Sequence, residues 1–392
     1  MMERIKKVFI KFVNLIDFIV SLLLIKIIHF KKTIIQDRTL LLIRLDSIGD
    51  YVLFRNFVSV IKTNNKYAEY KITLCGNIRW KDLAETFDSN NFETFIWVDR
   101  RKFRINPFYK YQILKKIYHA GFDIAIESAY TREILFGDII IKASKAEQRI
   151  GSTGSPENYS LWKRKLFSNK FYTKLIPLDE KNIFEFYRNK EYMQKLLGVN
   201  IHIEKPSIDV SKININLPVI NSFLVVVPGA QEKSRRWDIK NIIAVINHVL
   251  SRYEYCICIV GSHDDSKLAN KITQEISSKR IIDLTGKTNL VQLAKLISKS
   301  ELLISNDTSA VHFAAAVSTP FICISNGKHF GRFNPYPKEM NIKGTHVYPH
   351  YIESNLHSFA KLTEEFRFFS KININEITVD KVIEKIDMML QI

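Results

Sequence analysis

Apolar runs of strand length alternate with amphipathic helical stretches from residue 38 onward. The first run, 39–45, is almost continuously apolar, which is typical of a parallel strand buried on both faces. A turn at 46–50 and an amphipathic helix over 51–62 follow it. The pattern predicts further strands, separated by helical stretches, at 71–75, 94–98, 122–127 and 148–151. Such alternation predicts an α/β fold with a doubly wound parallel sheet.

A second series of the same kind begins near residue 221. Its predicted helices are 239–251, 266–277, 290–298, 309–317 and a closing helix at 378–390, and its predicted strands are 223–227, 256–260, 281–284, 301–305 and 321–325. The two series are separated by a polar stretch that contains Pro206 and Pro218. We therefore expect an N-terminal domain (38–200), a linker (201–220) and a C-terminal domain (221–392), with ligands bound in a cleft at the carboxyl ends of the strands.

The N-terminal segment 1–37 contains a strongly apolar run from Val8 to Phe30. Six polar residues interrupt this run and fall within about half of a helical wheel, namely Lys11, Asn14, Asp17, Ser21, Lys26 and His29. A central aspartate is costly in hydrocarbon. The pattern favours a helix lying in the plane of a membrane over a single-pass anchor or a helix packed on the protein's own body. No small-residue cleavage site follows the run, which argues against a signal peptide.

The chain has 392 residues and a formal net charge of +18, with 58 Lys+Arg against 40 Asp+Glu. Such a surface attracts polyanions. Neither zinc-finger spacing nor an aromatic RNA-binding strand is present, so we expect an anionic lipid or a phosphorylated glycan as partner and no nucleic acid. The four cysteines lie in apolar runs and are expected to be reduced core thiols. The pair His346 and His350 has no third ligand nearby in sequence, and we expect no metal.

The segment from Asn306 to Ala316 predicts an anion site. It joins a buried strand directly to an Ala-rich helix, and the first N–H groups of such a helix, with its dipole, attract negative charge. The diphosphate of a nucleotide-sugar suits this position. Alternatively, Asp307 or Thr308 only caps the helix.

Three ordered stretches resemble glycosyltransferase family nine, the heptosyltransferase family of lipopolysaccharide assembly. They are Leu42–Leu53 with its Ile-Gly-Asp turn, Val227–Ala230 with Arg235-Arg236-Trp237, and Asp283–Pro320 with its Asn-Asp-Thr-Ser block. The resemblance implies a GT-B fold of two Rossmann-like domains and inverting sugar transfer that requires neither cofactor nor metal. It further implies a nucleoside-diphosphate sugar such as ADP-heptose as donor, and a lipid-linked anionic glycan as acceptor.

The resemblance places the catalytic base at Asp50, which would take the proton of the acceptor hydroxyl. The alternative is that Asp50 or Asp46 only caps the following helix. The N-terminal domain binds the acceptor in this fold, so we expect acceptor contacts at Arg44 and Gly49 of the first stretch. The basic-aromatic run after residue 100 adds Arg101 and Arg104, although a solvated surface explains this run equally well.

Arg235 stands where the resemblance implies a phosphate-binding lysine, and Ser309 stands where the family usually has glycine. An arginine keeps the charge but changes the reach. Ser309 is compatible with the role unless the position needs a glycine-only backbone angle. The predicted donor-binding residues are Lys233, Arg235, Arg236, Gly229, Gly261, Asp265, Asp307, Thr308, Ser309 and Ala310, with a solvated basic loop and helix capping as the alternatives.

The sequence therefore favours an inverting glycosyltransferase, cytoplasmic and peripheral on the inner face of the cytoplasmic membrane, that extends a surface glycan. A nucleotide-sugar epimerase uses a similar pair of domains. A catalytically inactive glycan- or nucleotide-binding protein is the third hypothesis, because two expected site residues are replaced.

Overall fold

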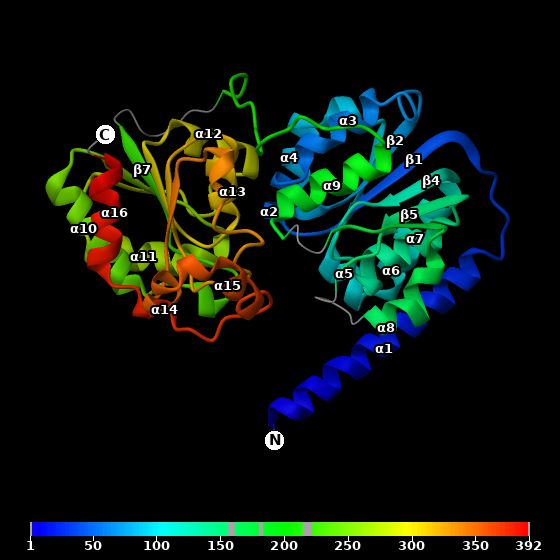
Figure 1. The fold of residues 1–392 in the computed structure, drawn as a ribbon, viewed down its shortest axis with the longest axis horizontal. Helices are drawn as coiled ribbons and strands as arrows, with labels where there is room; N and C mark the ends of the chain where they lie inside the picture. Colours follow the sequence, from blue (N-terminus) through cyan, green and yellow to red (C-terminus); the bar gives the residue numbers. More distant parts are fainter. Residues whose placement is uncertain (1, 156–160, 180–182, 215–221, 391–392) are drawn as a thin grey trace. The chain divides into compact units, whose positions relative to one another are not determined.

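The computed structural model describes residues 2–155, 161–179, 183–214 and 222–390. The chain divides into two compact units, of which unit 1 comprises 1–182 and 187–203, and unit 2 comprises 183–186 and 204–392. The predicted linker 201–220 lies partly outside the described residues. Each unit contains one six-stranded sheet surrounded by helices (Figure 1). The prediction of two doubly wound parallel sheets is confirmed.

The sheet of unit 1 has the strand order β3-β2-β1-β4-β5-β6, with every pair parallel. Leu41 of β1 is in register with Thr73 of β2 on one side and with Ala125 of β4 on the other. The strands are β1 (Gln36–Arg44), β2 (Lys71–Asn77), β3 (Thr94–Val98), β4 (Phe122–Glu127), β5 (Gln148–Ser152) and β6 (Lys174–Ile176).

Unit 2 repeats this topology in the order β12-β11-β10-β7-β8-β9. Its first strand, β7, pairs with the second and the fourth of the unit, as β1 does in unit 1. The strands are β7 (Phe223–Val227), β8 (Cys256–Ile259), β9 (Ile281–Asp283), β10 (Leu302–Asn306), β11 (Phe321–Ile324) and β12 (Gly344–Val347).

Local sequence signals explain where several helices begin and end. In α6, the Asn106 side chain accepts a hydrogen bond from the Tyr109 N–H, Pro107 occupies the first turn, and Gly121 ends the helix with φ 64°. The helices before β7 are α1 (Met2–Ile28), α2 (Ile48–Val52), α3 (Val58–Thr63), α4 (Lys81–Phe87), α5 (Arg100–Ile105), α6 (Pro107–Ala120), α7 (Ile139–Ser144), α8 (Leu161–Lys163) and α9 (Glu185–Leu197). Those after it are α10 (Ile239–Arg252), α11 (Ser266–Glu275), α12 (Leu290–Lys299), α13 (Ser309–Ala316), α14 (His350–Ser354), α15 (Phe359–Glu365) and α16 (Val379–Leu390).

The predicted single helix over 51–62 is wrong, because α2 ends at Val52 and a 3₁₀ turn, η1 (Arg55–Phe57), precedes α3. The side chains from Tyr51 to Phe54 are all fully buried, so this stretch has no polar face. Arg55 also turns inward, where its Nη2 lies 2.7 Å from Oδ1 of Asp88. A regular helix would carry some of these groups out to solvent.

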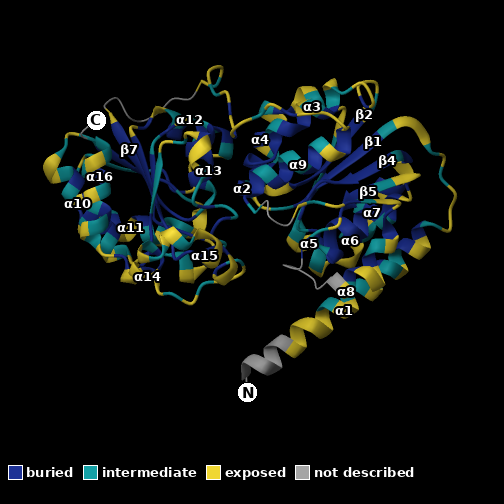
Figure 2. Cartoon of the chain, viewed as in Figure 1, coloured by how far each residue is buried: buried dark blue, intermediate teal, exposed yellow. Residues whose placement is uncertain are grey.

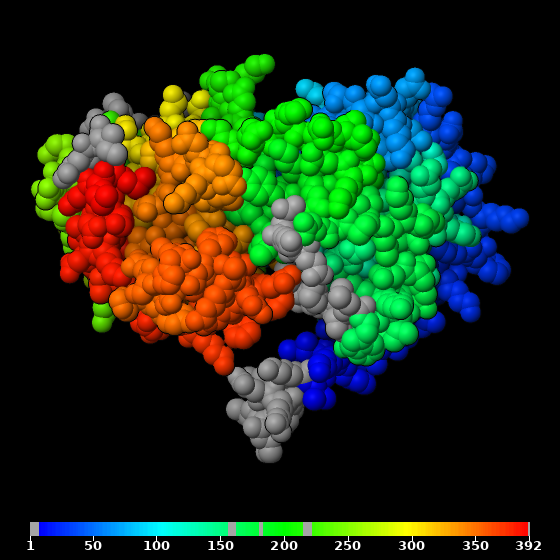
Figure 3. All heavy atoms as spheres, in the orientation of Figure 1, coloured from blue at the N-terminus to red at the C-terminus, as the bar shows by residue number. Residues whose placement is uncertain are grey.

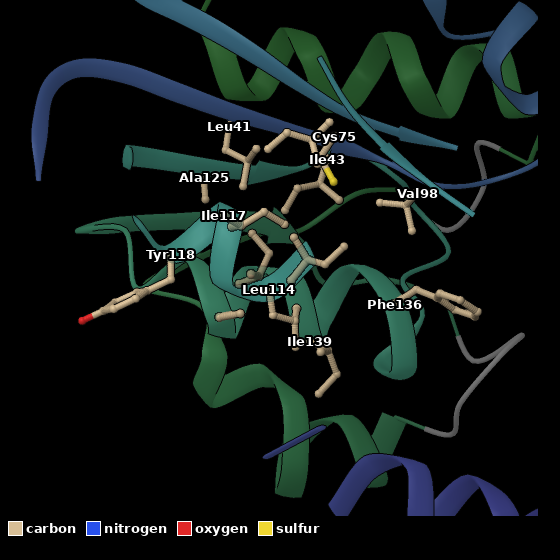
Figure 4. Packing of buried hydrophobic residues seen from close by; sticks show 14 of the residues in the cluster. Leu41, Ile43, Cys75, Val98, Leu114, Ile117, Tyr118, Ala125, Phe136 and Ile139 are labelled. Carbon is tan, nitrogen blue, oxygen red and sulfur yellow. The ribbon is translucent and has the colours of Figure 1, made fainter. Parts of the chain in front are cut away.

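The core of unit 1 forms where α6 and α7 cover one face of the sheet (Figure 4). Side chains of the strands and of these helices meet there, and the ones labelled in the figure are Leu41, Ile43, Cys75, Val98, Ala125, Leu114, Ile117, Tyr118, Phe136 and Ile139. All four cysteines of the chain are buried and free, as predicted. Segment 1–37 is not separate from unit 1, because Ile25 and Ile28 of α1 belong to this core and β1 already begins at Gln36.

Candidate functional site

The sequence motifs lie at the switch point of each sheet. In unit 1 the strand order reverses between β1 and β4, and in unit 2 between β7 and β10. Open α/β sheets bind their ligands outside the carboxyl ends of the strands at such a point. The turn 45–50 follows β1, the loop 228–237 follows β7, and residues 307–310 follow β10. We call these the carboxylate turn, the cationic loop and the α13 N-terminus.

Arg44 fixes the carboxylate turn from inside the protein. Its side chain is fully buried, its Nε lies 2.7 Å from Oδ2 of Asp46, and its Nη1 donates to the carbonyl of Ser128 at 3.0 Å. Its guanidinium also stacks over Phe54, 4.3 Å from the ring centroid. A second clamp comes from Asn77, whose Nδ2 donates to the Asp46 carbonyl at 2.9 Å. The turn is therefore held rigidly by buried groups.

Asp50 lies in the first turn of α2 and is partly exposed. Its Oδ2 accepts a hydrogen bond from the backbone N–H of Ser47 at 3.2 Å, so the carboxylate does cap the helix. Capping uses one acceptor site of a carboxylate that has about four. Asp46, in contrast, is engaged by the charge of Arg44. Arg44 also reaches Asp50, whose backbone carbonyl accepts from its Nη2 at 3.5 Å.

The predicted acceptor contacts have different surroundings. The full burial of Arg44 does not fit a contact with an acceptor, and Gly49 is buried within α2. Arg104 is turned toward α1, where its Nη2 donates to Oδ1 of Asn14 at 2.7 Å. Arg101 of α5 is exposed. The structure does not bring these four residues together at one surface.

Arg100, the residue before Arg101, contacts the carboxylate turn directly. It forms a two-pronged ion pair with Glu133, at 2.7 and 2.8 Å, and donates to the carbonyl of Leu45 at 2.7 Å. Burial opposes its charge, but Glu133 and the more distant Asp46 and Asp50 hold the pKa of Arg100 above its ordinary value. A permanent positive charge therefore lies beside this turn.

Two asparagines fasten the cationic loop of unit 2 to the ends of the central strands. Asn306, the last residue of β10, donates from Nδ2 to the carbonyl of Pro228 at 2.8 Å and accepts at Oδ1 from the Trp237 N–H at 3.0 Å. Asn326, just after β11, donates to the carbonyl of Ser234 at 3.1 Å. The loop is thus held against the carboxyl edge of the sheet near the α13 N-terminus.

Arg235 is the partly buried cation of this loop. Its Nε is buried and has no hydrogen-bond partner among the described residues. Burial raises the pKa of the Asp307 carboxyl, while the charge of Arg235 and hydrogen bonds from Ser325 (3.1 Å) and Asn334 (2.8 Å) favour the ionised form. Arg235 and the segment after β10 are therefore electrostatic neighbours, as the prediction of a shared anion site requires.

The α13 N-terminus is capped by Thr308, whose Oγ1 accepts from the Ala310 N–H at 3.3 Å. Asp307 is not the cap, because its carboxylate faces Ser325 and Asn334. The backbone N–H groups of Thr308 and Ser309 have no acceptor within the described part of the chain. Ser309 is the first residue of α13 and does not adopt a positive φ, so serine meets no backbone strain there. Two amides at the positive end of the helix dipole remain available to an anion.

The other predicted donor contacts are two cations, Lys233 and Arg236, and two glycines that lie beside Asp265. Lys233 is exposed, whereas Arg236 donates from Nε to the carbonyl of Ala230 at 2.6 Å. Gly229 and Gly261 both lie against the carboxylate of Asp265, and a Cβ at Gly229 would overlap it.

Asp265 itself accepts from the N–H and the hydroxyl of Ser262, at 2.9 and 2.7 Å. The structure thus shows Asp265 as a cap, and both glycines make room for it.

His312 is a buried hydrogen-bonded residue of α13, as its helical position indicates. Its Nδ1 lies 2.7 Å from the hydroxyl of Tyr336, and burial lowers the pKa of His312 to about 4. His346 lies 2.9 Å from Oδ1 of Asn334. No group of three or more His, Cys, Asp or Glu side chains within the described ranges is placed to hold a metal ion.

Three asparagines hold the site together: Asn306 at the start of the predicted anion segment, Asn334 in a loop expected to border the donor pocket, and Asn326, for which no role was predicted. Each is nearly fully buried, and each bonds a backbone or carboxylate group of the site. The available signal was the position of Asn306 and Asn326 at the ends of buried strands, where a buried amide is expected only if it has partners.

The family-model comparison covers the second and third motif stretches and begins after the first. A family model described as glycosyltransferase family 9 (heptosyltransferase) matches residues 112–361. The Escherichia coli protein lipopolysaccharide heptosyltransferase 3 is 27% identical over 211 residues, which cover 52% of this chain and 59% of that protein. The chain therefore matches little more than half the length of this curated relative.

Solved structures share the fold at low sequence identity. The glycosyl transferase family 9 protein of Veillonella parvula superposes with a TM-score of 0.67 at 17% identity, covering 91% of this chain and 98% of that one. The E. coli heptosyltransferase WaaC with ADP gives a TM-score of 0.66 at 14% identity, covering 90% and 99%. This chain has two Rossmann-like sheets and shares its fold with solved heptosyltransferases. The fold is therefore GT-B.

Proposed function

Because this chain belongs to glycosyltransferase family 9, we propose that it is an inverting, metal-independent glycosyltransferase. It transfers a sugar from a nucleoside-diphosphate donor to a lipopolysaccharide or a related surface glycan. Heptose is the sugar and ADP-heptose the donor to test first, since the curated relative is a heptosyltransferase and the WaaC structure contains ADP.

The position of the motifs at both switch points is the observation that carries this proposal. A carboxylate turn follows the central strand of unit 1, while a cation and two available amides follow the central strands of unit 2. A proton acceptor and a diphosphate-binding group are the two functions that inverting transfer requires.

In the proposed reaction, Asp50 accepts the proton of the acceptor hydroxyl as its oxygen attacks the anomeric carbon. The bond from this carbon to the diphosphate oxygen breaks, and the nucleoside diphosphate leaves with the bonding pair. Arg235 and the amides of Thr308 and Ser309 stabilise the charge that develops on it. Asp46 keeps Arg44 paired and takes no part in proton transfer.

The acceptor in this proposal is an anionic glycan on a lipid, so the enzyme works on the inner face of the cytoplasmic membrane. The net charge of +18 favours association with anionic head groups and phosphorylated glycans. Among the predicted donor and acceptor contacts, Lys233 and Arg101 are exposed.

The test is incubation of the purified protein with a panel of nucleotide-sugars and lipopolysaccharide precursors of increasing length, followed by mass spectrometry. We expect one added sugar on one acceptor, with inversion at the anomeric carbon by NMR. A changed sugar formed from donor alone would instead indicate an epimerase. Tight donor binding without turnover on any acceptor would indicate an inactive binding protein.

A further inference from the structure

Helix α1 presents a continuous apolar surface to solvent. Figure 2 shows α1 as the most exposed long helix of unit 1. Phe12, Ile19 and Leu23 are 59%, 48% and 55% exposed, and Phe30 just after the helix is 91% exposed. We call the outer face of α1 the surface formed by Phe9, Phe12, Ile16, Ile19, Leu23 and Ile27. An exposed apolar patch of this extent marks a binding surface.

The polar side of α1 is held by the protein itself, which is the reverse of an ordinary surface helix. Asp17 pairs with Lys110 and with Arg104, whose Nε lies 3.0 Å from Oδ2 of the aspartate. Lys110 is 1% exposed and also donates to the hydroxyl of Ser21 at 2.9 Å. The sequence pattern favoured a helix in the plane of a membrane over one packed on the protein's own body, and the structure shows that this side of α1 does pack on unit 1. Asn14, Asp17 and Ser21 bond Arg104 of α5 and Lys110 of α6, which leaves the apolar side outward.

A second exposed apolar segment lies beside α1. Phe167 contacts Phe18 of α1 edge to face, with ring centroids 6.1 Å apart. Trp162 and Leu166, which precede it in the chain, are 60% and 57% exposed. In Figure 3 the blue atoms of α1 abut the green atoms of this segment. Tryptophan and phenylalanine at such a position are typical of the membrane–water boundary.

Basic groups border the apolar surface. An open hollow of about 470 Å³ is lined by Leu22, Ile25, Lys26, His29, Phe30 and Lys142. A water molecule accounts for about 30 Å³ of liquid, so the hollow has room for a phosphorylated head group. His29 is held by the carbonyl of Ala143 at 3.0 Å, and its neighbours Lys142 and Lys145 are both positive. The hollow thus combines an apolar base with two ammonium groups.

We propose that α1 docks in the plane of a membrane, with its outer face and Trp162 in the boundary region and an anionic phospholipid head group in the hollow beside Lys26 and Lys142. The inference deepens the proposed function, since it assumes that the acceptor membrane is the surface in question. It adds the identity of the surface that binds the membrane and the class of lipid that this surface binds.

Two other occupants fit the surface less well. The segment Val8–Ile28 could cross a membrane by length and composition, with mean hydropathy 2.4. Crossing would pull Asp17 from Lys110 and Ile25 from the core of unit 1, leaving two charges unpaired. A second copy of the chain would bring the same lysines together, and like charges repel.

Co-sedimentation of the full chain with vesicles tests the inference. The vesicles contain either phosphatidylcholine alone or phosphatidylcholine with phosphatidylglycerol. We expect tight binding only to the anionic vesicles, weakened by salt. Ile19→Asp/Leu23→Asp should lose at least tenfold in affinity, and Lys26→Glu/Lys142→Glu about 25-fold, since each lysine near an anionic surface contributes about fivefold. Matched controls are Phe369→Asp and Lys267→Glu, exposed residues of unit 2 that should bind as the wild type does.

Equal vesicle binding by Ile19→Asp/Leu23→Asp and the wild type would overturn the inference. So would a wild-type dimer in analytical ultracentrifugation that the same variant converts to monomer, because a second copy would then cover α1. Sugar transfer to a detergent-solubilised acceptor separates this inference from the proposed function. Variants that no longer bind vesicles but still transfer sugar to this acceptor support both the docking inference and the proposed function. Vesicle binding without any sugar transfer supports membrane docking and rejects the proposed activity.

Discussion

The side-chain amide of Asn306 bonds the backbone of Trp237 at 3.0 Å, across 69 positions of sequence. The same amide reaches the carbonyl of Pro228 at the other end of the cationic loop. One residue at the end of β10 therefore ties both ends of the loop that carries Arg235. Because Asn306 is 1% exposed, water does not replace these bonds when they are lost.

Asn306→Ala should lower the free energy of unfolding by about 3 kcal/mol, since an unsatisfied buried polar group costs about 1–3 kcal/mol and two would be left. Donor affinity should fall as well, because the cationic loop loses its anchor. Asn326→Ala removes one bond to the same loop and should cost about 1 kcal/mol. Denaturant unfolding and calorimetric titration with ADP-heptose measure both effects. Equal stability of the two variants would contradict this account of the loop.

Asp50→Asn should reduce transfer by about 10²- to 10⁴-fold, the range of a lost general base, with donor affinity unchanged within about twofold. The amide oxygen can still accept from Ser47, which preserves the cap of α2. Single-turnover transfer and donor titration report the two quantities.

Asp46→Asn is the matched control and should behave in the opposite way. It removes a carboxylate paired with the fully buried Arg44, and breaking such a buried pair typically costs about 3–5 kcal/mol of stability. Wild-type turnover in Asp50→Asn would remove Asp50 from the proposed role.

The fold was predictable where the apolar pattern is strong. The ten predicted strands all exist, and the central strands β1, β4, β7 and β10 are predominantly apolar runs that the sheets bury. The two missed strands, β6 and β12, are short edge strands at the ends of the sheets, and partly exposed residues occupy most of their positions. An edge strand needs no continuous apolar run, so nothing in its sequence separates it from a loop.

The candidate site was predictable to the level of segments and not of side chains. Strand ends and helix starts place the carboxylate turn and the α13 N-terminus, but the inward direction of Arg44 depends on Ser128 and Asn189, far away in sequence. For the same reason, the helical wheel of α1 predicted correctly which residues form its polar side but not which residues surround them. Lys110 and Arg104, which turn that side inward, are about 90 residues away.

Because His312 is buried with a lowered pKa, the free energy of unfolding should decrease on acidification. Its folded pKa of about 4 lies below the unfolded value of 6.5, so the unfolded chain binds the proton first as pH falls. The contribution is present above pH 6.5 and is lost as pH falls toward 4. Between pH 7.5 and 5 it amounts to about 2 kcal/mol. His312→Gln should lose less stability over this interval than the wild type in denaturant unfolding. Exposed His202→Gln is the control, and a slope in His312→Gln equal to that of His202→Gln would contradict the prediction.

Asp17→Asn should destabilise the chain by about 3 kcal/mol, because it leaves the buried ammonium of Lys110 without a counter-charge. The double variant Asp17→Asn/Lys110→Met should recover much of this loss, since it removes the charge that must be paired. Limited proteolysis at α1, alongside unfolding, shows whether the helix detaches from unit 1. Additive losses in the double variant would mean that the pair does not hold α1.

Ser309→Asp separates helix stability from donor binding, because the two should change in opposite directions. A carboxylate at the first position of α13 interacts favourably with the helix dipole, by about 0.3–1 kcal/mol, so the protein should become slightly more stable. The same charge would repel a diphosphate at the amides of Thr308 and Ser309. At about 4 Å in a protein surface environment this repulsion is of order 4 kcal/mol, enough for at least a tenfold loss of donor affinity. Ser309→Gly, with the residue that the family usually has, should bind donor within about threefold of the wild type. If Ser309→Asp binds ADP-heptose as the wild type does, the leaving group lies elsewhere, and the α13 N-terminus is only the end of a capped helix.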